Sequence, residues 1–200
     1  MGKFVGILDY GAGNVFSVIK ALDAAGLSFK VVESDDDIDQ AVFLLLPGVG
    51  SFDQVMDMIR SYPFYDKFMH SVIVENKPIV GICIGMQILC ESSAEGGSDG
   101  LGLIEDSQVV YFETSPFKTN LGPSQVSSNT FISDEKNRFY FLHSLHVSVP
   151  EQYVISKAYF GAEFPCMIKK NNIIGIQFHP EKSHTNGIKL FRNLYEFFAT

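Results

Sequence analysis

The sequence predicts an α/β fold in which an open, mostly parallel β-sheet is flanked by helices and extended by antiparallel strands. In the first half of the chain, short apolar runs alternate with segments of helical periodicity, and in the second half several apolar runs follow one another closely. The chain has 200 residues, of which 46% are hydrophobic and 19% charged, so it is long enough to bury a full core. We expect a single domain over residues 1–200.

The first half supplies the parallel part of this sheet. The predicted strands are Phe4 to Leu8, Phe29 to Val32, Val42 to Leu46 and Ile79 to Ile82. Between the first two strands, apolar residues recur at the spacing of one helix face: Val15, Val18, Ile19 and Leu22. Gly26 follows this stripe as a C-cap. The two strands and the helix between them therefore form a β–α–β unit. Further helices are expected after Ser51 and after Pro63, whose fixed φ suits a first helical turn.

The second half is predicted to extend or flank the sheet with antiparallel strands. They lie near Val109 to Phe112, Phe139 to Leu142, Val154 to Tyr159, Met167 to Lys169 and Ile173 to Phe178. Thr114 to Ser128 is rich in Ser, Thr, Asn, Gly and Pro, so we expect a loop there. The end of the chain predicts a helix docked on the core, because one helical face carries Ile188, Phe191, Tyr195 and Phe198.

Composition argues against several classes of function. A formal net charge of −8 argues against binding to nucleic acid or to an anionic membrane surface. No apolar run approaches the ~20 residues that span a bilayer, and the first residues enter a predicted strand instead of a signal peptide, so we expect a cytoplasmic protein. Cys83, Cys90 and Cys166 cannot all pair and lack zinc-ligand spacing. We therefore expect no metal and no cofactor.

The most informative segment is the strand that runs into Gly81-Ile82-Cys83-Ile84-Gly85 and then into a helical pattern that includes Cys90. A G-x-C-x-G turn between strand and helix is typical of a nucleophile elbow, in which flanking glycines remove side chains that would collide. The helix N-terminus would stabilise a Cys83 thiolate, and the N–H of Ile84 would face a substrate oxyanion. The alternative is a buried cysteine with glycines for close packing.

A base for this thiol is predicted at His179, at the end of the last strand. Because side chains alternate along a strand, His179 and Glu181 are expected on the same side, where the carboxylate orients the imidazole. A lone histidine at a strand end is more often structural. Together with the elbow, however, Glu181 favours a Cys83–His179–Glu181 triad.

Two glycine-rich turns follow other strands. Pro47-Gly48-Val49-Gly50 is able to direct peptide N–H groups into a cleft at the carboxyl edge of the sheet and to complete an oxyanion hole. Asp9-Tyr10-Gly11-Ala12-Gly13-Asn14 contains a G-x-G, but Phe16 stands where a dinucleotide-binding fingerprint has its third glycine. We therefore do not interpret this turn as a nucleotide site.

Taken together, these segments resemble the class I (triad) glutamine amidotransferases. Within that class, Asp9 to Asn14, Leu46 to Gly50, Gly85-Met86-Gln87 and His179 to Ser183 are similar to the glutaminase subunits of imidazole glycerol phosphate synthases. The resemblance implies a flavodoxin-like core and hydrolysis of glutamine to glutamate and ammonia through the triad. It also implies a heterodimer in which ammonia passes to a (β/α)₈ synthase (cyclase) subunit that makes imidazole glycerol phosphate and AICAR in histidine biosynthesis.

The same resemblance implies roles for further residues. The N–H groups of Val49, which follows Gly48, and of Ile84 would bind the oxyanion, and Gln87 and Glu95 would contact the amino-acid end of glutamine. Ser144 would line the substrate site. The partner would dock near Asn14, Tyr140 and Lys182, which are otherwise ordinary surface or turn residues. We also expect that the Gly48–Val49 peptide must flip to complete the oxyanion hole.

One segment departs from the family pattern. Family members carry a Met-Gly-Trp-Asn-like segment where this chain has Thr119 to Asn129, and the chain has no tryptophan. The aromatic residue that follows the His-Ser pair in the family is Leu145 here. This departure favours a paralogous glutaminase that supplies ammonia for amidino-sugar formation in surface-polysaccharide biosynthesis as an alternative. Two further alternatives are a stand-alone thiol hydrolase, which would share the elbow, and a catalytically silent scaffold subunit, against which the presence of Cys83, His179 and Glu181 argues.

Overall fold

The computed structural model describes residues 3–113, 119–132 and 137–199. Its main sheet contains β1 (Phe4–Ile7), β2 (Phe29–Val31), β3 (Ala41–Gly48), β4 (Ile79–Cys83), β10 (Val154–Phe160), β11 (Ala162–Lys170) and β12 (Ile173–Ile176). The strand order is β10-β11-β12-β4-β3-β1-β2. The five strands from β12 to β2 pair in parallel, whereas β10 and β11 are added antiparallel. The predicted fold class is confirmed.

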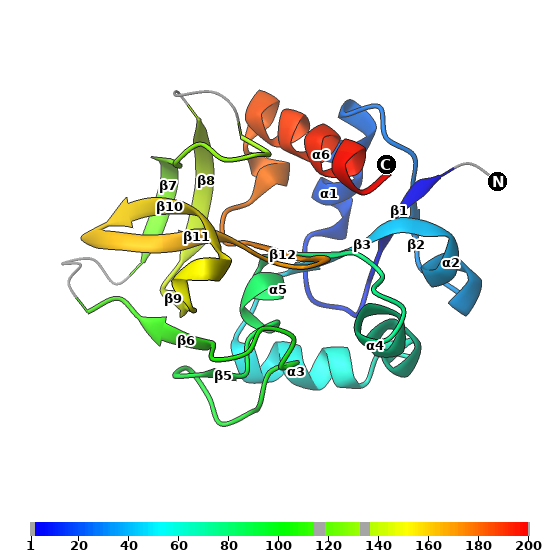
Figure 1. The fold of residues 1–200 in the computed structure, drawn as a ribbon, viewed down its shortest axis with the longest axis horizontal. Helices are drawn as coiled ribbons and strands as arrows, with labels where there is room; N and C mark the ends of the chain where they lie inside the picture. The colour runs from blue at the N-terminus through cyan, green and yellow to red at the C-terminus, as the bar shows by residue number, and fades with distance from the viewer. Residues whose placement is uncertain (1–2, 114–118, 133–136, 200) are drawn as a thin grey trace.

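Helices cover both faces of this sheet (Figure 1). They are α1 (Val15–Ala24), α2 (Asp35–Gln40), α3 (Phe52–Arg60), α4 (Tyr65–Ile73), α5 (Ile84–Gln87) and α6 (His184–Ala199), with 3₁₀ turns η1 (Glu151–Tyr153) and η2 (Pro180–Lys182). Helices α1 and α6 lie on one face, and α3 and α4 lie on the other. Alternate residues of β3 enter the two cores: Leu44 and Leu46 pack with α3, and Phe43 and Leu45 with α6. None of the helices in the described part of the chain has the length and apolar character that a membrane crossing requires.

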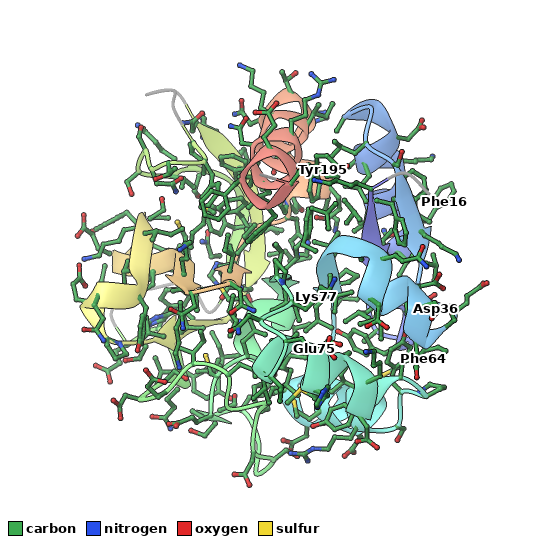
Figure 2. The ribbon with its side chains drawn as sticks, turned by 45° about the vertical axis from the view of Figure 1, so that its right-hand side comes forward. Phe16, Asp36, Phe64, Glu75, Lys77 and Tyr195 are labelled. Atoms are coloured by element: carbon green, nitrogen blue, oxygen red, sulfur yellow. The ribbon has the colours of Figure 1, made fainter. Side chains whose placement is uncertain are left out.

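The helix predictions hold for α1, α3, α4 and α6. The Asn14 side chain caps α1 by accepting a hydrogen bond from the Ser17 N–H, and Gly26 ends the helix at φ +70°. Val18 and Leu22 are buried, whereas Phe16 lies on the outer side of α1 (Figure 2). The stripe of α1 therefore faces the core as its spacing predicts.

The prediction of a loop at Thr114 to Ser128 is wrong for most of residues 119–128, which the structure describes, because a strand lies there. Two small sheets flank the main one: β5 (Ser92–Ser93), β6 (Gln108–Tyr111) and β9 (Leu145–Ser148) form the first, and β7 (Asn120–Gln125) and β8 (Arg138–His143) the second. Strand β7 pairs along its whole length with β8, and every second residue faces solvent. Pro123 is tolerated because β7 is an edge strand. Residues 114–118 lie outside the described residues.

Two element boundaries also differ from expectation. Helix α5 ends at Gln87, so Cys90 lies beyond the helix, buried in a turn. Strand β12 ends at Ile176, so His179 does not end a strand. Instead, the His179 N–H donates a 2.8 Å hydrogen bond to the Tyr140 carbonyl in an isolated bridge. A contact with β8, remote in sequence, therefore positions His179.

Candidate active site

Cys83 sits on a strained turn where β4 meets α5. Its φ of +56° and ψ of −113° lie in a region that L-residues rarely occupy. A Cβ at position 85 would overlap the Leu46 carbonyl oxygen, and one at position 81 would overlap the backbone of Gly85. Both glycines are therefore required for the elbow, as the sequence predicts.

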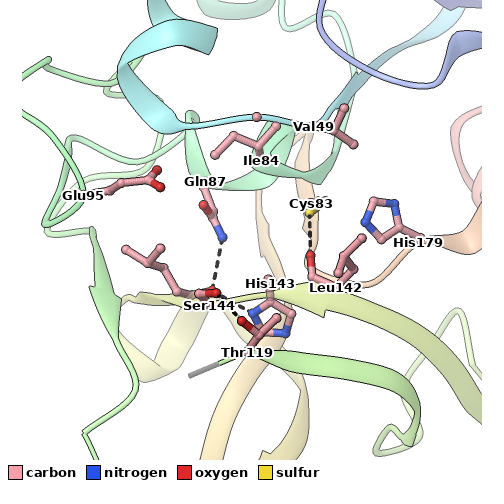
Figure 3. A pocket seen from close by; sticks show the side chains of 12 residues that line it. Val49, Cys83, Ile84, Gln87, Glu95, Thr119, Leu142, His143, Ser144 and His179 are labelled. Atoms are coloured by element: carbon pink, nitrogen blue, oxygen red, sulfur yellow. Dashed lines mark hydrogen bonds between the residues drawn. The ribbon is translucent and has the colours of Figure 1, made fainter. Parts of the chain in front are cut away.

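His179 and Glu181 form a buried pair beside the thiol. The His179 Nδ1 and the Glu181 Oε1 are 2.7 Å apart, and the two side chains are only 2% and 4% exposed. Figure 3 shows the imidazole beside the Cys83 sulfur. Glu181 reaches the ring from the 3₁₀ turn η2 and not by alternation along a strand. The expected grouping is present, but a turn produces it.

The surroundings of His179 determine the protonation state of its imidazole. Burial by itself lowers the pKa of His179, but hydrogen bonding to Cys83 and Glu181 and their charges outweigh burial and raise this pKa to about 9. At neutral pH the imidazole is therefore protonated. A protonated Nε2 next to a cysteine sulfur is able to donate a proton to a leaving amine.

The oxyanion segment, which we define as residues Gly48–Ser51, lies next to Cys83. Gly48 pairs with Cys83 in the sheet, and a Cβ at Gly48 would overlap Ile84 and approach the Tyr10 hydroxyl. Tyr10 donates a 2.8 Å hydrogen bond to the Pro47 carbonyl. Val49, by contrast, is 45% exposed. The segment is thus tightly packed at its first residue and open at its second.

The turn that follows β1 supports this segment. Gly13 has a φ of +126°, and a Cβ there would come within 3.1 Å of the Pro47 carbonyl oxygen. The glycine at position 13 therefore allows the backbone of the turn after β1 to lie close to the backbone of Pro47 and Gly48. Sequence reasoning found no role for Tyr10 and Gly13, although two glycines after a strand are a signal of close backbone approach.

These elements surround a cavity of about 260 Å³. It is lined by Val49, Gly50, Cys83, Ile84, Gln87, Glu95, Thr119, Leu142, His143, Ser144, Leu145 and His179 (Figure 3). The predicted residues of the nucleophile, base, oxyanion and glutamine subsites therefore line one cavity, with Gly48 and Glu181 immediately behind it. Asn14, Tyr140 and Lys182 do not line it.

The three residues expected to contact glutamine have fixed side chains. Gln87 Nε2 donates to the Leu145 carbonyl at 3.2 Å and to Gln177 Oε1 at 3.1 Å. Glu95 Oε2 accepts from the Phe52 N–H at 2.7 Å. Ser144 Oγ lies 2.9 Å from Thr119 Oγ1. These hydrogen bonds therefore hold three side chains of the cavity wall in place.

Sequence reasoning missed Gln177 and Asn120. The Gln177 amide lies 3.9 Å from the Cys83 sulfur and also holds Gln87. His143 Nδ1 is 2.7 Å from the Leu145 carbonyl, and its Nε2 is 3.2 Å from the Asn120 amide nitrogen. Burial lowers the pKa of His143 to about 4, so this ring is neutral and braces the β8–β9 turn. No local signal marks either residue, because each acts across strands that are distant in sequence.

The predicted docking residues lie outside the cavity. Lys182 Nζ is 5.6 Å from the centre of the Tyr140 ring, and the Tyr140 N–H donates to the Ser183 hydroxyl. Asn14 is exposed at the start of α1. Across the described ranges, no group of three or more His, Cys, Asp or Glu residues is placed to hold a metal ion.

A sequence model of the class-I glutamine amidotransferases matches residues 6–196. The chain belongs to this family. Among proteins similar to this member of the family, the imidazole glycerol phosphate synthase subunit HisH of Leptospira interrogans is 40% identical over 94% of this chain and 98% of its own length. HisH 2 of Pseudomonas aeruginosa is 38% identical over 95% and 98%. The family resemblance predicted from the motifs is confirmed.

Solved structures agree on the class-I amidotransferase fold. A crystal structure of a glutamine amidotransferase superposes with a TM-score of 0.75 at 20% identity, covering 98% of this chain and 99% of that one. PurLQS from Thermotoga maritima gives 0.74 at 19% identity, with the same coverage. At these identities the match establishes the fold alone.

Proposed function

We propose that the chain is the glutaminase subunit of an imidazole glycerol phosphate synthase and provides ammonia from glutamine for histidine biosynthesis. One observation carries the proposal: Cys83, the His179–Glu181 pair and the oxyanion segment meet at one cavity. The near full-length similarity to HisH subunits supports the pathway. The site lies within one domain over residues 1–200 of a cytoplasmic protein.

The geometry suits acyl transfer to sulfur. The Cys83 thiolate attacks the side-chain amide carbon of glutamine, and the N–H groups of Val49 and Ile84 bind the resulting oxyanion. As the intermediate collapses, the C–N bond breaks and His179 gives its proton to the leaving nitrogen, which departs as ammonia. His179 then removes a proton from water, which attacks the γ-glutamyl thioester, and the C–S bond breaks to release glutamate and restore the thiolate beside a protonated His179.

The other end of the cavity binds the amino-acid end of glutamine. Gln87, Glu95 and Ser144 line it, and Glu95 supplies a carboxylate for the α-ammonium group. No metal and no cofactor is needed for this chemistry. Because the Glu95 carboxylate lines this end of the cavity, free glutamine with its charged α-ammonium group is favoured over a peptide.

The ammonia is used by a partner. A (β/α)₈ synthase subunit docks near Asn14, Tyr140 and Lys182 to form a heterodimer, and ammonia passes to it without entering bulk water. Val49 is half exposed. We expect docking of the synthase to complete the oxyanion hole here, because the Gly48–Val49 peptide flips so that its N–H faces the oxyanion. A partly formed hole protects glutamine from idle hydrolysis, since one donor contributes about 2.7–4 kcal/mol to the transition state.

The test is glutamate release from glutamine by the purified chain, alone and with the imidazole-pathway synthase subunit of the same organism plus its nucleotide ligand. Cys83→Ala is the blank, and Cys90→Ala is the matched control because Cys90 is a buried thiol outside the cavity. Strong, Cys83-dependent stimulation by this synthase is expected. Equal turnover with and without the synthase would contradict the gating mechanism, and no turnover in any condition would favour the scaffold alternative.

A second candidate is the paralogous glutaminase of amidino-sugar formation. It is favoured by the segment Thr119 to Asn129, which lacks tryptophan and carries Leu121, 65% exposed, on β7. Leu142, directly opposite on β8, is also exposed and lines the cavity. Stimulation by a polysaccharide-pathway synthase but not by the histidine-pathway synthase would select this candidate.

A further inference from the structure

The first turn of α3 has no cap from its own chain segment. Ser51 is the N-cap residue, but its side chain makes no capping hydrogen bond. The Phe52 N–H instead donates to Oε2 of Glu95, 43 positions later in the chain. A residue of the glutamine cavity thus caps the helix that directly follows the oxyanion segment.

Asp53 makes the reciprocal contacts. Its Oδ2 accepts the Gly97 N–H at 3.2 Å and its Oδ1 accepts the Ser98 N–H at 3.0 Å. These backbone hydrogen bonds hold the pKa of Asp53 below its usual value, so the side chain is ionised at neutral pH. We call this double set of contacts, Phe52 and Asp53 with Glu95, Gly97 and Ser98, the clasp.

The clasp leaves no room for a side chain at position 96. A Cβ built on Gly96 would overlap the Asp53 carboxylate. The glycines after Glu95 thus allow the loop to lie against Asp53, and the hydrogen bonds to Asp53 hold it there. The structure therefore shows a loop that is tied to α3.

The clasp joins the two parts of the site that are not fixed by the elbow. On one side, the oxyanion segment ends at Ser51, one residue before Phe52. On the other side, the Glu95 carboxylate lines the cavity with one oxygen bound to α3 and points toward Gln87 (Figure 3). Displacing the loop would therefore move the carboxylate and loosen the anchor of Val49 together.

We propose that Asp53 is a positioning residue for glutamine hydrolysis: it holds the 96–98 loop so that Glu95 meets the substrate's α-ammonium group and anchors the oxyanion segment. The proposal rests on the proposed function, because it takes glutamine as the substrate. Asp53 itself does not line the cavity and touches no reacting atom. Its effect on catalysis passes through Glu95.

The test compares glutamine with glutaramate, which is glutamine without the α-amino group, in the synthase-activated full-length protein. Asp53→Ala is expected to lower the glutamine/glutaramate ratio of kcat/KM about tenfold, and Glu95→Gln is expected to lower it by a similar factor. The double variant is expected to lower the ratio little further, because both changes remove one interaction. Asp57→Ala, which removes an exposed carboxylate one turn later on α3, is the matched control and should leave the ratio unchanged.

An equal loss of activity on both substrates would overturn the proposal, since a merely structural role does not distinguish them. Asp53→Asn keeps one acceptor oxygen and the side-chain shape, so a smaller fall in the ratio is expected, and this variant carries the test if Asp53→Ala fails to fold. If the unaltered, synthase-activated protein hydrolyses neither substrate, the proposed function itself fails. A normal unaltered enzyme with an unchanged ratio in both Asp53 variants overturns only the role of Asp53.

Discussion

The two walls of the cavity are held in place in different ways. On the nucleophile wall, Cys83 is fixed by backbone packed against backbone, with Gly81 and Gly85 admitting contacts that no side chain would allow. On the second wall, which consists of the oxyanion segment and the loop after Glu95, Val49 is half exposed and the Glu95 carboxylate accepts a hydrogen bond from α3. A backbone that is packed closely against another backbone has no room to adopt a second conformation. A loop held by hydrogen bonds, in contrast, is able to move by exchanging one hydrogen-bond partner for another. If a synthase partner activates the site, we expect it to act on the oxyanion wall and to leave the nucleophile in place.

The largest expected effect comes from the buried pair behind the nucleophile. Glu181→Gln is expected to lower kcat by up to about 10⁴-fold, because the amide no longer holds the imidazole in one tautomer or stabilises its charge. The measurement is synthase-activated glutamate release. KM for glutamine should stay nearly unchanged, since Glu181 does not line the cavity.

Glu163→Gln provides the control for this change, because it removes an exposed carboxylate from β11. It should retain full activity. A Glu181→Gln protein as active as this control would mean that the pair is structural and would remove the contrast between a fixed catalytic wall and an adjustable one.

A smaller loss is expected on the oxyanion wall. Val49→Pro removes one backbone N–H and should lower kcat of the activated complex about 10²–10³-fold. Val49→Ala keeps the N–H and should retain most activity. If the isolated chain already has an incomplete hole, the two variants should differ much less without the synthase. A difference of the same size with and without partner would argue against a peptide that flips.

The nucleophile wall should show its rigidity as lost stability. Gly85→Ala forces a methyl group against the Leu46 carbonyl oxygen and is expected to cost about 1–3 kcal/mol of unfolding free energy. Urea denaturation measures this cost. Gly97→Ala is the matched change on the other wall, where a Cβ meets nothing within 4 Å, and it should be nearly neutral. Equal costs at both positions would contradict the comparison.

The mildest test is the pH dependence of His179. Its pKa is raised to about 9, so the stability it contributes is fully present below pH 6.5 and is lost as the pH rises through about 9. Removing the sulfur by Cys83→Ala should lower this pKa, because Cys83 is one cause of the shift. Histidine NMR titration measures the midpoint. An unchanged midpoint in Cys83→Ala would show that Glu181 alone sets the charge.

Local sequence patterns predicted most of the parallel core. Strands β1 to β4 and helix α1 follow from apolar periodicity and from turn residues such as Gly26, which act over a few positions. The same patterns failed at Asn120 to Gln125, where pairing with β8 makes a strand from residues of low strand propensity. They also placed His179 at a strand end, although a bridge to Tyr140 and the turn η2 position it.

The sequence by itself determined the elbow, the candidate triad residues and the family, because these depend on residue types within short motifs. Only the tertiary structure decided what surrounds them: Tyr10 on Pro47, Gln177 beside Cys83, and Asp53 on the loop after Glu95. Each of these contacts joins residues at least 37 positions apart. Local propensity carries no information about such pairs, and the packing of the sheet and its helices brings them within hydrogen-bond distance.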